Sequence, residues 1–166
     1  MQLETSRPAL RHAPLDQGFP LDGVAVVLNS RARAVTRRMV RRLSELHPRQ
    51  HLFLSESFDH NREIATQLAQ STYHTVLFGG GDGTFVCCLN DLQDACRKYG
   101  RPLPRVGVLP MGTGNAIGYY QGISPSLRGL ASQIERANQL HGPTQSLPLL
   151  RVNGRLSPFA GTGLDS

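Results

Sequence analysis

The chain has 166 residues, of which 39% are hydrophobic and 18% charged, a composition typical of one globular domain with short appendages. No apolar run approaches the roughly 20 residues that a membrane-spanning helix needs, and residues 1–22 lack the continuous apolar core of a secretory signal. The three cysteines show no metal-type spacing with histidine, so we expect reduced, buried thiols in a cytoplasmic protein whose first 22 residues form a flexible tail.

The net charge of +6 comes largely from one arginine-rich segment. A solvated helix face is the default interpretation of such a segment, and a site for anionic lipid or nucleotide phosphate is an alternative. Nucleic acid is the least expected partner, because no aromatic residue that could stack on bases lies between the arginines. The segment contains Arg31, Arg33, Arg37, Arg38, Arg41 and Arg42.

Strand and helix patterns alternate along the chain. Short apolar runs rich in β-branched residues predict buried strands, and apolar residues at helical spacing predict the helices between them. This alternation predicts an α/β fold, a Rossmann-like parallel sheet with helices on both faces. In chain order we expect a strand at 24–28, a helix at 35–46, a strand at 51–54, a helix around 64–69, a strand at 75–78, a helix at 84–99, a strand at 106–109 and a helix at 127–137 that Ser124 and Pro125 begin.

The pattern changes after about residue 145. Two extended runs, 147–152 and 155–160, flank Asn153 and Gly154, and an Asn-Gly pair is a strong hairpin signal because both turn residues adopt positive φ. We therefore expect an α/β domain over residues 23–145, and over 146–166 the first hairpin of a C-terminal β domain that is incomplete.

A glycine-rich loop follows the third predicted strand and opens the next helix. Its sequence is Gly79-Gly80-Gly81-Asp82-Gly83-Thr84. Glycines let phosphate oxygens approach the backbone, and the N–H groups of a helix N-terminus attract an anion. Asp82 would repel a bare phosphate, so it indicates a bound Mg²⁺ or a hydroxyl to be activated. The alternative is a structural glycine turn in which Asp82 caps the helix.

A second loop of small residues follows the fourth predicted strand and reads Pro110-Met111-Gly112-Thr113-Gly114-Asn115. Two such loops at the carboxyl ends of successive strands can converge on one ligand, because ligands bind at that edge of an open parallel sheet. The alternative, that each loop is only a structural connection, would have to hold for both loops.

The pair of loops resembles the catalytic domain of the diacylglycerol kinase, sphingosine kinase and bacterial lipid kinase family. Weaker matches extend the resemblance over residues 23–166, including Val152 to Arg155 and Gly161 to Asp165. The resemblance implies a two-domain enzyme that uses ATP and Mg²⁺ to phosphorylate the hydroxyl of a lipid such as diacylglycerol or a sphingoid base, in a cleft between the domains.

Residue roles follow from the same resemblance. Asp82 would belong to the Mg²⁺ and phosphate network and act as the catalytic residue, since the matching aspartate is assigned as the base in the sphingosine kinase branch. Asp165 would face the interdomain cleft. The expected nucleotide-binding residues are Asn29, Ser55, Gly80, Gly81, Asp82, Gly83, Thr84, Gly112, Thr113, Gly114 and Asn115.

The sequence departs from the family pattern near this site. Val86-Cys87 stands where an Asn-Glu pair is usual, Ala116 and Pro148 each replace a frequent aspartate, and Ser30 replaces a proline. The lost polar groups suggest weakened metal binding, and we expect residues 1–166 alone to bind ATP without turning over. The alternatives are a non-catalytic nucleotide-binding module or degenerate fragment, and an NAD kinase, which shares the first loop but not usually the second.

Overall fold

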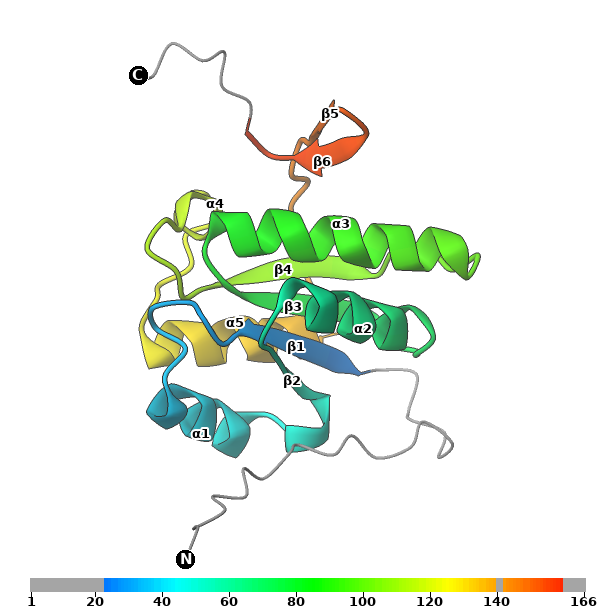
Figure 1. The fold of residues 1–166 in the computed structure, drawn as a ribbon. Coiled ribbons are helices and arrows are strands. Elements are labelled where there is room, and N and C mark those ends of the chain that lie inside the picture. Colours follow the sequence, from blue (N-terminus) through cyan, green and yellow to red (C-terminus); the bar gives the residue numbers. More distant parts are fainter. Residues whose placement is uncertain (1–22, 140–141, 160–166) are drawn as a thin grey trace, which may run out of the picture.

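The computed structural model describes residues 23–139 and 142–159. Its centre is a four-stranded parallel sheet in the spatial order β2-β1-β3-β4 (Figure 1). The first strand in the sequence therefore lies inside the sheet, between the second and the third. The strands are β1 (Val24–Asn29), β2 (Leu52–Ser55), β3 (Thr75–Gly80) and β4 (Arg105–Pro110).

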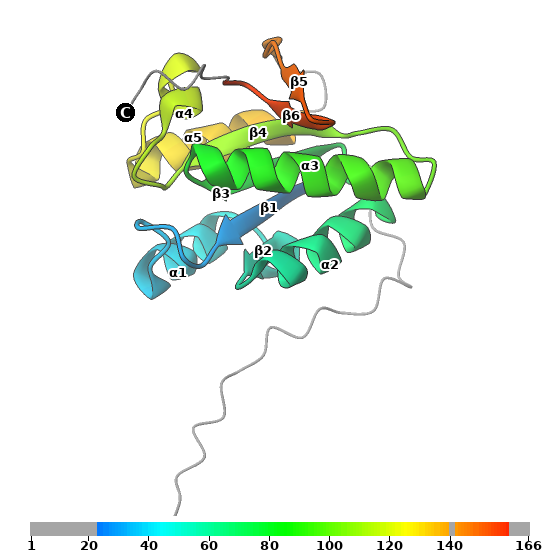
Figure 2. The same cartoon turned by 45° about the horizontal axis from the view of Figure 1, so that its top comes forward.

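Helices cover both faces of the sheet, which confirms the predicted fold class (Figures 1 and 2). One face carries α1 (Arg37–Leu46) and α5 (Leu127–Asn138). The other carries α2 (Phe58–Ala69) and α3 (Asp82–Lys98).

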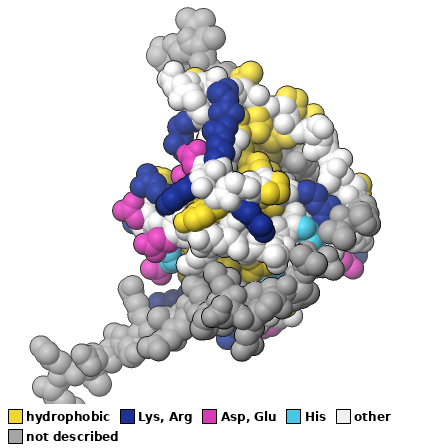
Figure 3. All heavy atoms as spheres, turned by 90° about the vertical axis from the view of Figure 1, so that its right-hand side faces the viewer, with side chains coloured by type: hydrophobic (Ala, Val, Ile, Leu, Met, Phe, Trp, Pro, Cys, Tyr) yellow, Lys and Arg dark blue, Asp and Glu magenta, His cyan; other side chains and the backbone are white. Residues whose placement is uncertain are grey.

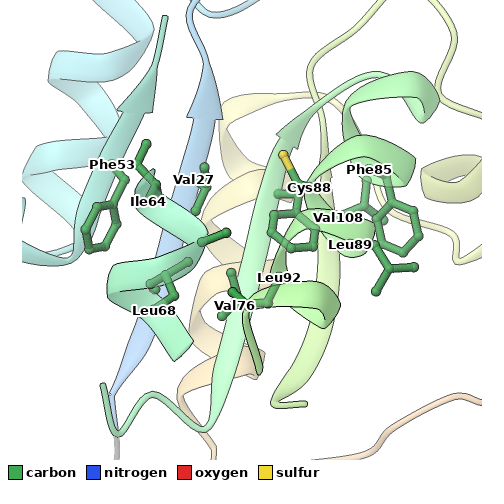
Figure 4. Packing of buried hydrophobic residues seen from close by; sticks show 14 of the residues in the cluster. Val27, Phe53, Ile64, Leu68, Val76, Phe85, Cys88, Leu89, Leu92 and Val108 are labelled. Atoms are coloured by element: carbon green, nitrogen blue, oxygen red, sulfur yellow. The ribbon is translucent and has the colours of Figure 1, made fainter. Parts of the chain in front are cut away.

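Alternate residues of β1 point to the two faces. Val24, Val26 and Leu28 pack with α1 and α5, and Ala25 and Val27 pack with α2 and α3. A strand covered on both sides must be apolar at every position, which explains the continuous run that predicted it. Figure 4 shows the core on the α2 and α3 side, where Val27, Phe53, Val76 and Val108 of the strands meet Ile64, Leu68, Phe85, Leu89 and Leu92 of the helices.

Two short helical segments were not predicted. They are α4 (Ala116–Tyr120) and the 3₁₀ turn η1 (Arg49–His51). The start of α5 also differs from the expectation. Ser126 is its N-cap, with a hydroxyl that accepts the N–H of Gly129 at 3.2 Å, whereas the Ser124 hydroxyl donates to that of Ser126 at 3.0 Å. Pro125 therefore precedes the helix and does not begin it.

The predicted hairpin is present as β5 (Leu150–Val152) and β6 (Arg155–Ser157), shorter than the expected runs. Asn153 and Gly154 have φ values of 49° and 81°, the turn geometry that their pair predicts. The hairpin lies on α3 through the buried side chain of Asn90. Its Nδ2 donates to the Leu156 carbonyl at 2.9 Å, and its Oδ1 accepts the Leu156 N–H at 2.8 Å.

The end of the molecule where the strands begin carries several hydrophobic and basic side chains on its surface (Figure 3). They include Arg97 and Lys98 in the last turn of α3 and the half-exposed Leu103 in the loop that follows. His47 is buried at this end, with its Nε2 2.9 Å from the Val24 carbonyl oxygen. The glycine-rich loops lie at the opposite end of the sheet.

Candidate functional site

The sequence motifs meet at the carboxyl ends of β1, β3 and β4. After β1 the chain passes to β2 on one side, while β3 lies on the other side, so the connections diverge between β1 and β3. Ligands bind at such switch points of open α/β sheets. A cleft opens there, which we call the glycine cleft. It is lined by Asn29, Arg31, Ala32, Arg33, Gly81, Asp82, Gly83, Thr84, Gly112, Thr113 and Gly114.

The two glycine-rich loops touch through their backbones. The Met111 N–H donates to the Gly80 carbonyl at 2.9 Å, and the Asp82 N–H donates to the Gly114 carbonyl at 3.2 Å. A Cβ on Gly112 would lie 2.2 Å from Gly81 Cα, and a Cβ on Gly81 would lie 2.8 Å from the Gly114 oxygen. Gly81 and Gly112 are therefore needed for the contact between the loops.

Gly83 differs from these two glycines. A Cβ built on it meets no atom within 4 Å, and the residue is exposed in the first turn of α3. The sequence assigned both Gly81 and Gly83 to nucleotide binding, but of these two only Gly83 has open space where a side chain would stand. A side chain there would project into the space where a ligand can approach the helix N-terminus.

Asn29 ties the turn after β1 to the first turn of α3. Its Nδ2 donates to Thr84 Oγ1 at 2.9 Å, and its Oδ1 accepts the Arg31 N–H at 3.0 Å. Gly80 is packed beneath this contact, because a Cβ on it would lie 2.5 Å from Thr84 Oγ1. Asn29 and Thr84, both assigned to nucleotide binding from the sequence, thus lie together at the glycine cleft.

Asn115 closes the second loop on itself. Its Oδ1 accepts the Gly112 N–H at 3.0 Å and its Nδ2 donates to the Gly112 carbonyl at 2.9 Å. Thr113 and Gly114 are left exposed at the rim of the cleft. Asn115 therefore acts on the shape of the loop, while the exposed Thr113 can present its hydroxyl to a ligand.

Asp82 binds the start of α4. Its Oδ2 accepts the Ala116 N–H at 2.9 Å and its Oδ1 accepts the Ile117 N–H at 3.0 Å. The carboxylate thus satisfies two N–H groups at a helix N-terminus other than its own. Among the described residues, no group of three His, Cys, Asp or Glu side chains is placed to hold a metal ion. A metal role for Asp82 stays a prediction that this arrangement does not favour.

A second pocket adjoins the glycine cleft and shares Asn29, Arg31, Gly83 and Thr84 with it. We call it the side pocket. Ser55 lies in its wall at the carboxyl end of β2, where the sequence placed it, and its hydroxyl donates to the Ser57 carbonyl at 3.2 Å. The other lining residues are Glu56, Ser57, Phe58, Asn61, Cys87 and Cys88.

The inner wall of the side pocket is a buried polar network that the sequence did not predict. Asn61 donates to Asp91 Oδ2 at 2.6 Å, and its Oδ1 accepts the thiol of Cys88 at 3.0 Å. Burial raises the pKa of Cys88 to about 12, and burial together with the Asp91 carboxylate raises the pKa of Cys87. Both thiols therefore remain protonated at neutral pH. The only sequence signal was a polar residue, Asn61, one turn before Ile64 on the apolar stripe of α2.

The family model for the diacylglycerol kinase catalytic domain matches residues 24–144. The chain belongs to this family. A crystal structure of a diacylglycerol kinase from Bacillus anthracis str. Sterne has a similar fold, with a TM-score of 0.60, 18% identity and coverage of 81% of this chain and 44% of that one. The chain thus spans less than half the length of that kinase. No curated protein sequence gives a significant match.

Membership of the family confirms the resemblance that the two glycine-rich loops indicated. It establishes a catalytic domain of the kinase type. Asp165, which the sequence placed at the interdomain cleft, lies outside the described residues.

Proposed function

We propose that this chain is the nucleotide-binding domain of an ATP-dependent lipid kinase that phosphorylates the hydroxyl of diacylglycerol or a sphingoid base. The observation that carries the proposal is the meeting of the two glycine-rich loops in one cleft with Arg31 and Arg33. The α3 N-terminus adds its positive dipole end to the same place, together with the N–H groups of Gly83 and Thr84, which have no acceptor among the described residues.

In this proposal the phosphates of ATP lie in the glycine cleft and the nucleoside lies in the side pocket. The backbone at Gly83, the hydroxyls of Thr84 and Thr113, and the two arginines would bind phosphate oxygens. Ser55 would contact the nucleoside. Phosphoryl transfer depends mainly on positioning and on stabilising the developing negative charge, which are the tasks these groups can perform.

A divalent cation would neutralise charge on the phosphates as they react. The described residues that line the cleft do not fit one as a protein-held ion, because Asp82 is the only carboxylate among them and both of its oxygens accept backbone N–H groups. The same occupation of Asp82 favours the second candidate function, a nucleotide-binding module without catalysis.

Nucleotide binding is tested by replacing Gly83 with leucine. We expect the ATP dissociation constant to rise at least about tenfold, since a side chain there obstructs the approach to the helix N-terminus. The fold should remain intact, because the site is open and leucine is about 1 kcal/mol more favourable than glycine in a helix. Isothermal titration calorimetry measures the affinity, and Asp94→Leu, an exposed position farther along α3, is the matched control. Unchanged ATP affinity in folded Gly83→Leu protein would contradict the assignment.

Lipid phosphorylation separates the two candidate functions. The family resemblance places the acceptor pocket in a second domain, of which the described residues include only β5 and β6. With labelled ATP and mixed micelles of diacylglycerol or sphingosine, we expect residues 1–166 to bind ATP without making product above background. Product that depends on the lipid and is lost in Gly83→Leu would show that this chain also holds the acceptor.

A membrane contact is proposed for α1, because a lipid kinase must reach its acceptor. Arg37, Arg38, Arg41 and Arg42 are exposed on this helix. Near anionic lipid each basic residue contributes about 1 kcal/mol. We expect sedimentation with phosphatidylserine vesicles that weakens when these four arginines become glutamine. Equal binding to neutral and anionic vesicles would argue against the contact. No helix in the described parts of the chain is long and apolar enough to cross a bilayer.

A further inference from the structure

The side chains at the glycine cleft determine how the negative charge of the ATP phosphates is compensated. Building on the nucleotide site proposed above, we propose that Arg31 and Arg33 compensate the phosphate charge in place of a divalent cation. The cleft then binds metal-free ATP at least as tightly as the magnesium complex of ATP.

The turn after β1 fixes the backbone of both arginines beside the loops. The Arg31 N–H donates to Asn29 Oδ1 at 3.0 Å, and the Ala34 N–H donates to the Met111 carbonyl at 3.0 Å. The backbone on either side of Arg33 is thereby attached to β1 and to the second glycine-rich loop. The position of the two side chains at the cleft follows from these contacts and from the lining itself.

The guanidinium groups themselves remain available. Both arginines are exposed, and within residues 23–139 and 142–159 neither side chain has a hydrogen-bond or ion-pair partner. Arg42 on α1, by contrast, pairs with Glu45 at 3.4 Å. A guanidinium offers five N–H donors in a planar fork that matches phosphate oxygens, so two unpaired ones beside the N-terminus of α3 form a strong anion site.

The cleft has few groups that could hold a cation. Among the described residues Asp82 is the only carboxylate in its lining, and its oxygens accept the N–H groups of Ala116 and Ile117 at 2.9 and 3.0 Å. Mg²⁺ is usually held by one or two carboxylates together with substrate phosphates. A cation here would have to compete for a carboxylate already bound by two N–H groups, and would face repulsion from two arginines.

Free ATP carries more negative charge than its magnesium complex, so a cleft dominated by arginine attracts it more strongly. The test is an ATP titration by calorimetry, with excess EDTA in one series and with MgCl₂ in the other. Wild-type protein is compared with Arg31→Gln, Arg33→Gln and the control Arg49→Gln, an exposed arginine of η1 at the end of the sheet where β2 begins. Circular dichroism establishes that each variant is folded.

We expect the dissociation constant of wild-type protein in EDTA to equal or fall below that in MgCl₂. Arg31→Gln and Arg33→Gln should each raise the dissociation constant in EDTA about tenfold, the effect of losing one charge-assisted hydrogen bond. Arg49→Gln should leave it unchanged. ATP binding that requires Mg²⁺, or wild-type affinity in both cleft variants, would overturn the inference and leave the proposed function standing. Failure to bind ATP both in EDTA and in MgCl₂ would overturn the inference and the proposed function together.

Discussion

Gly112→Ala is expected to lower the free energy of unfolding by about 3 kcal/mol, the upper range for overpacking a tight site. The new methyl group would lie 2.2 Å from Gly81 Cα and 2.4 Å from Gly81 N, which are backbone atoms that cannot turn aside. The two glycine-rich loops would have to separate, and the Met111 to Gly80 and Asp82 to Gly114 hydrogen bonds would lengthen or break. We expect ATP binding to be lost with them.

Thermal and urea unfolding measure this effect, with Gly83→Ala as the matched control. Its methyl group meets no atom within 4 Å and lies in a helix, so it should leave stability unchanged or raise it by up to about 1 kcal/mol. If Gly112→Ala were as stable as the wild type, the close contact between the loops would be wrong.

Asn90→Ala is expected to release the β5–β6 hairpin from α3. Asn90 is 3% exposed and makes three hydrogen bonds, one to the Val86 carbonyl at 2.7 Å and two to the backbone of Leu156. Without it, the buried N–H and C=O of Leu156 lose their partners, each at about 1–3 kcal/mol. Because detaching the hairpin returns these groups to water, we expect local opening before global unfolding.

Limited trypsin digestion detects such opening, because Arg151 and Arg155 lie in the hairpin. We expect cleavage after these arginines to accelerate at least about tenfold in Asn90→Ala, corresponding to about 1.4 kcal/mol of lost docking. Asp94→Ala, an exposed position one turn along α3, should be cleaved at the wild-type rate. Equal cleavage of Asn90→Ala and wild type would show that the hairpin is attached by other contacts.

The sequence predicted the elements whose signals are local. Strands buried on both faces read as apolar runs, amphipathic helices repeat their apolar residues every third or fourth position, and Asn153-Gly154 specifies its turn. The helix α4 escaped prediction because it has five residues and its first N–H groups bind Asp82, 34 and 35 positions away. The cap of α5 was placed at Ser124 because proline favours the first position of a helix, whereas Ser126 is the N-cap in the structure.

The candidate site was predictable in its location and less so in its details. Loops after parallel strands must meet at one edge, so Asn29, Thr84 and Gly112 could be grouped from the sequence. Which of these residues face a ligand and which hold the loops together could not be predicted, because this depends on which backbone atoms of the two loops touch. Within the arginine-rich segment, the sequence likewise could not separate the residues at the cleft from those on the helix. Arg31 and Arg33 line the cleft, whereas Arg37 and the following arginines lie exposed on α1.

The place of β1 inside the sheet has a consequence for synthesis of the chain. β1 pairs with β2 on one side and with β3 on the other, and Val24 finds its partner only at Thr75. At about 5–20 residues per second, roughly 50 residues take several seconds to make. During that interval one edge of an apolar strand has no partner within the sheet, and unpaired edges associate with other chains. On the ribosome, the period before β3 emerges is therefore when this protein most needs a chaperone.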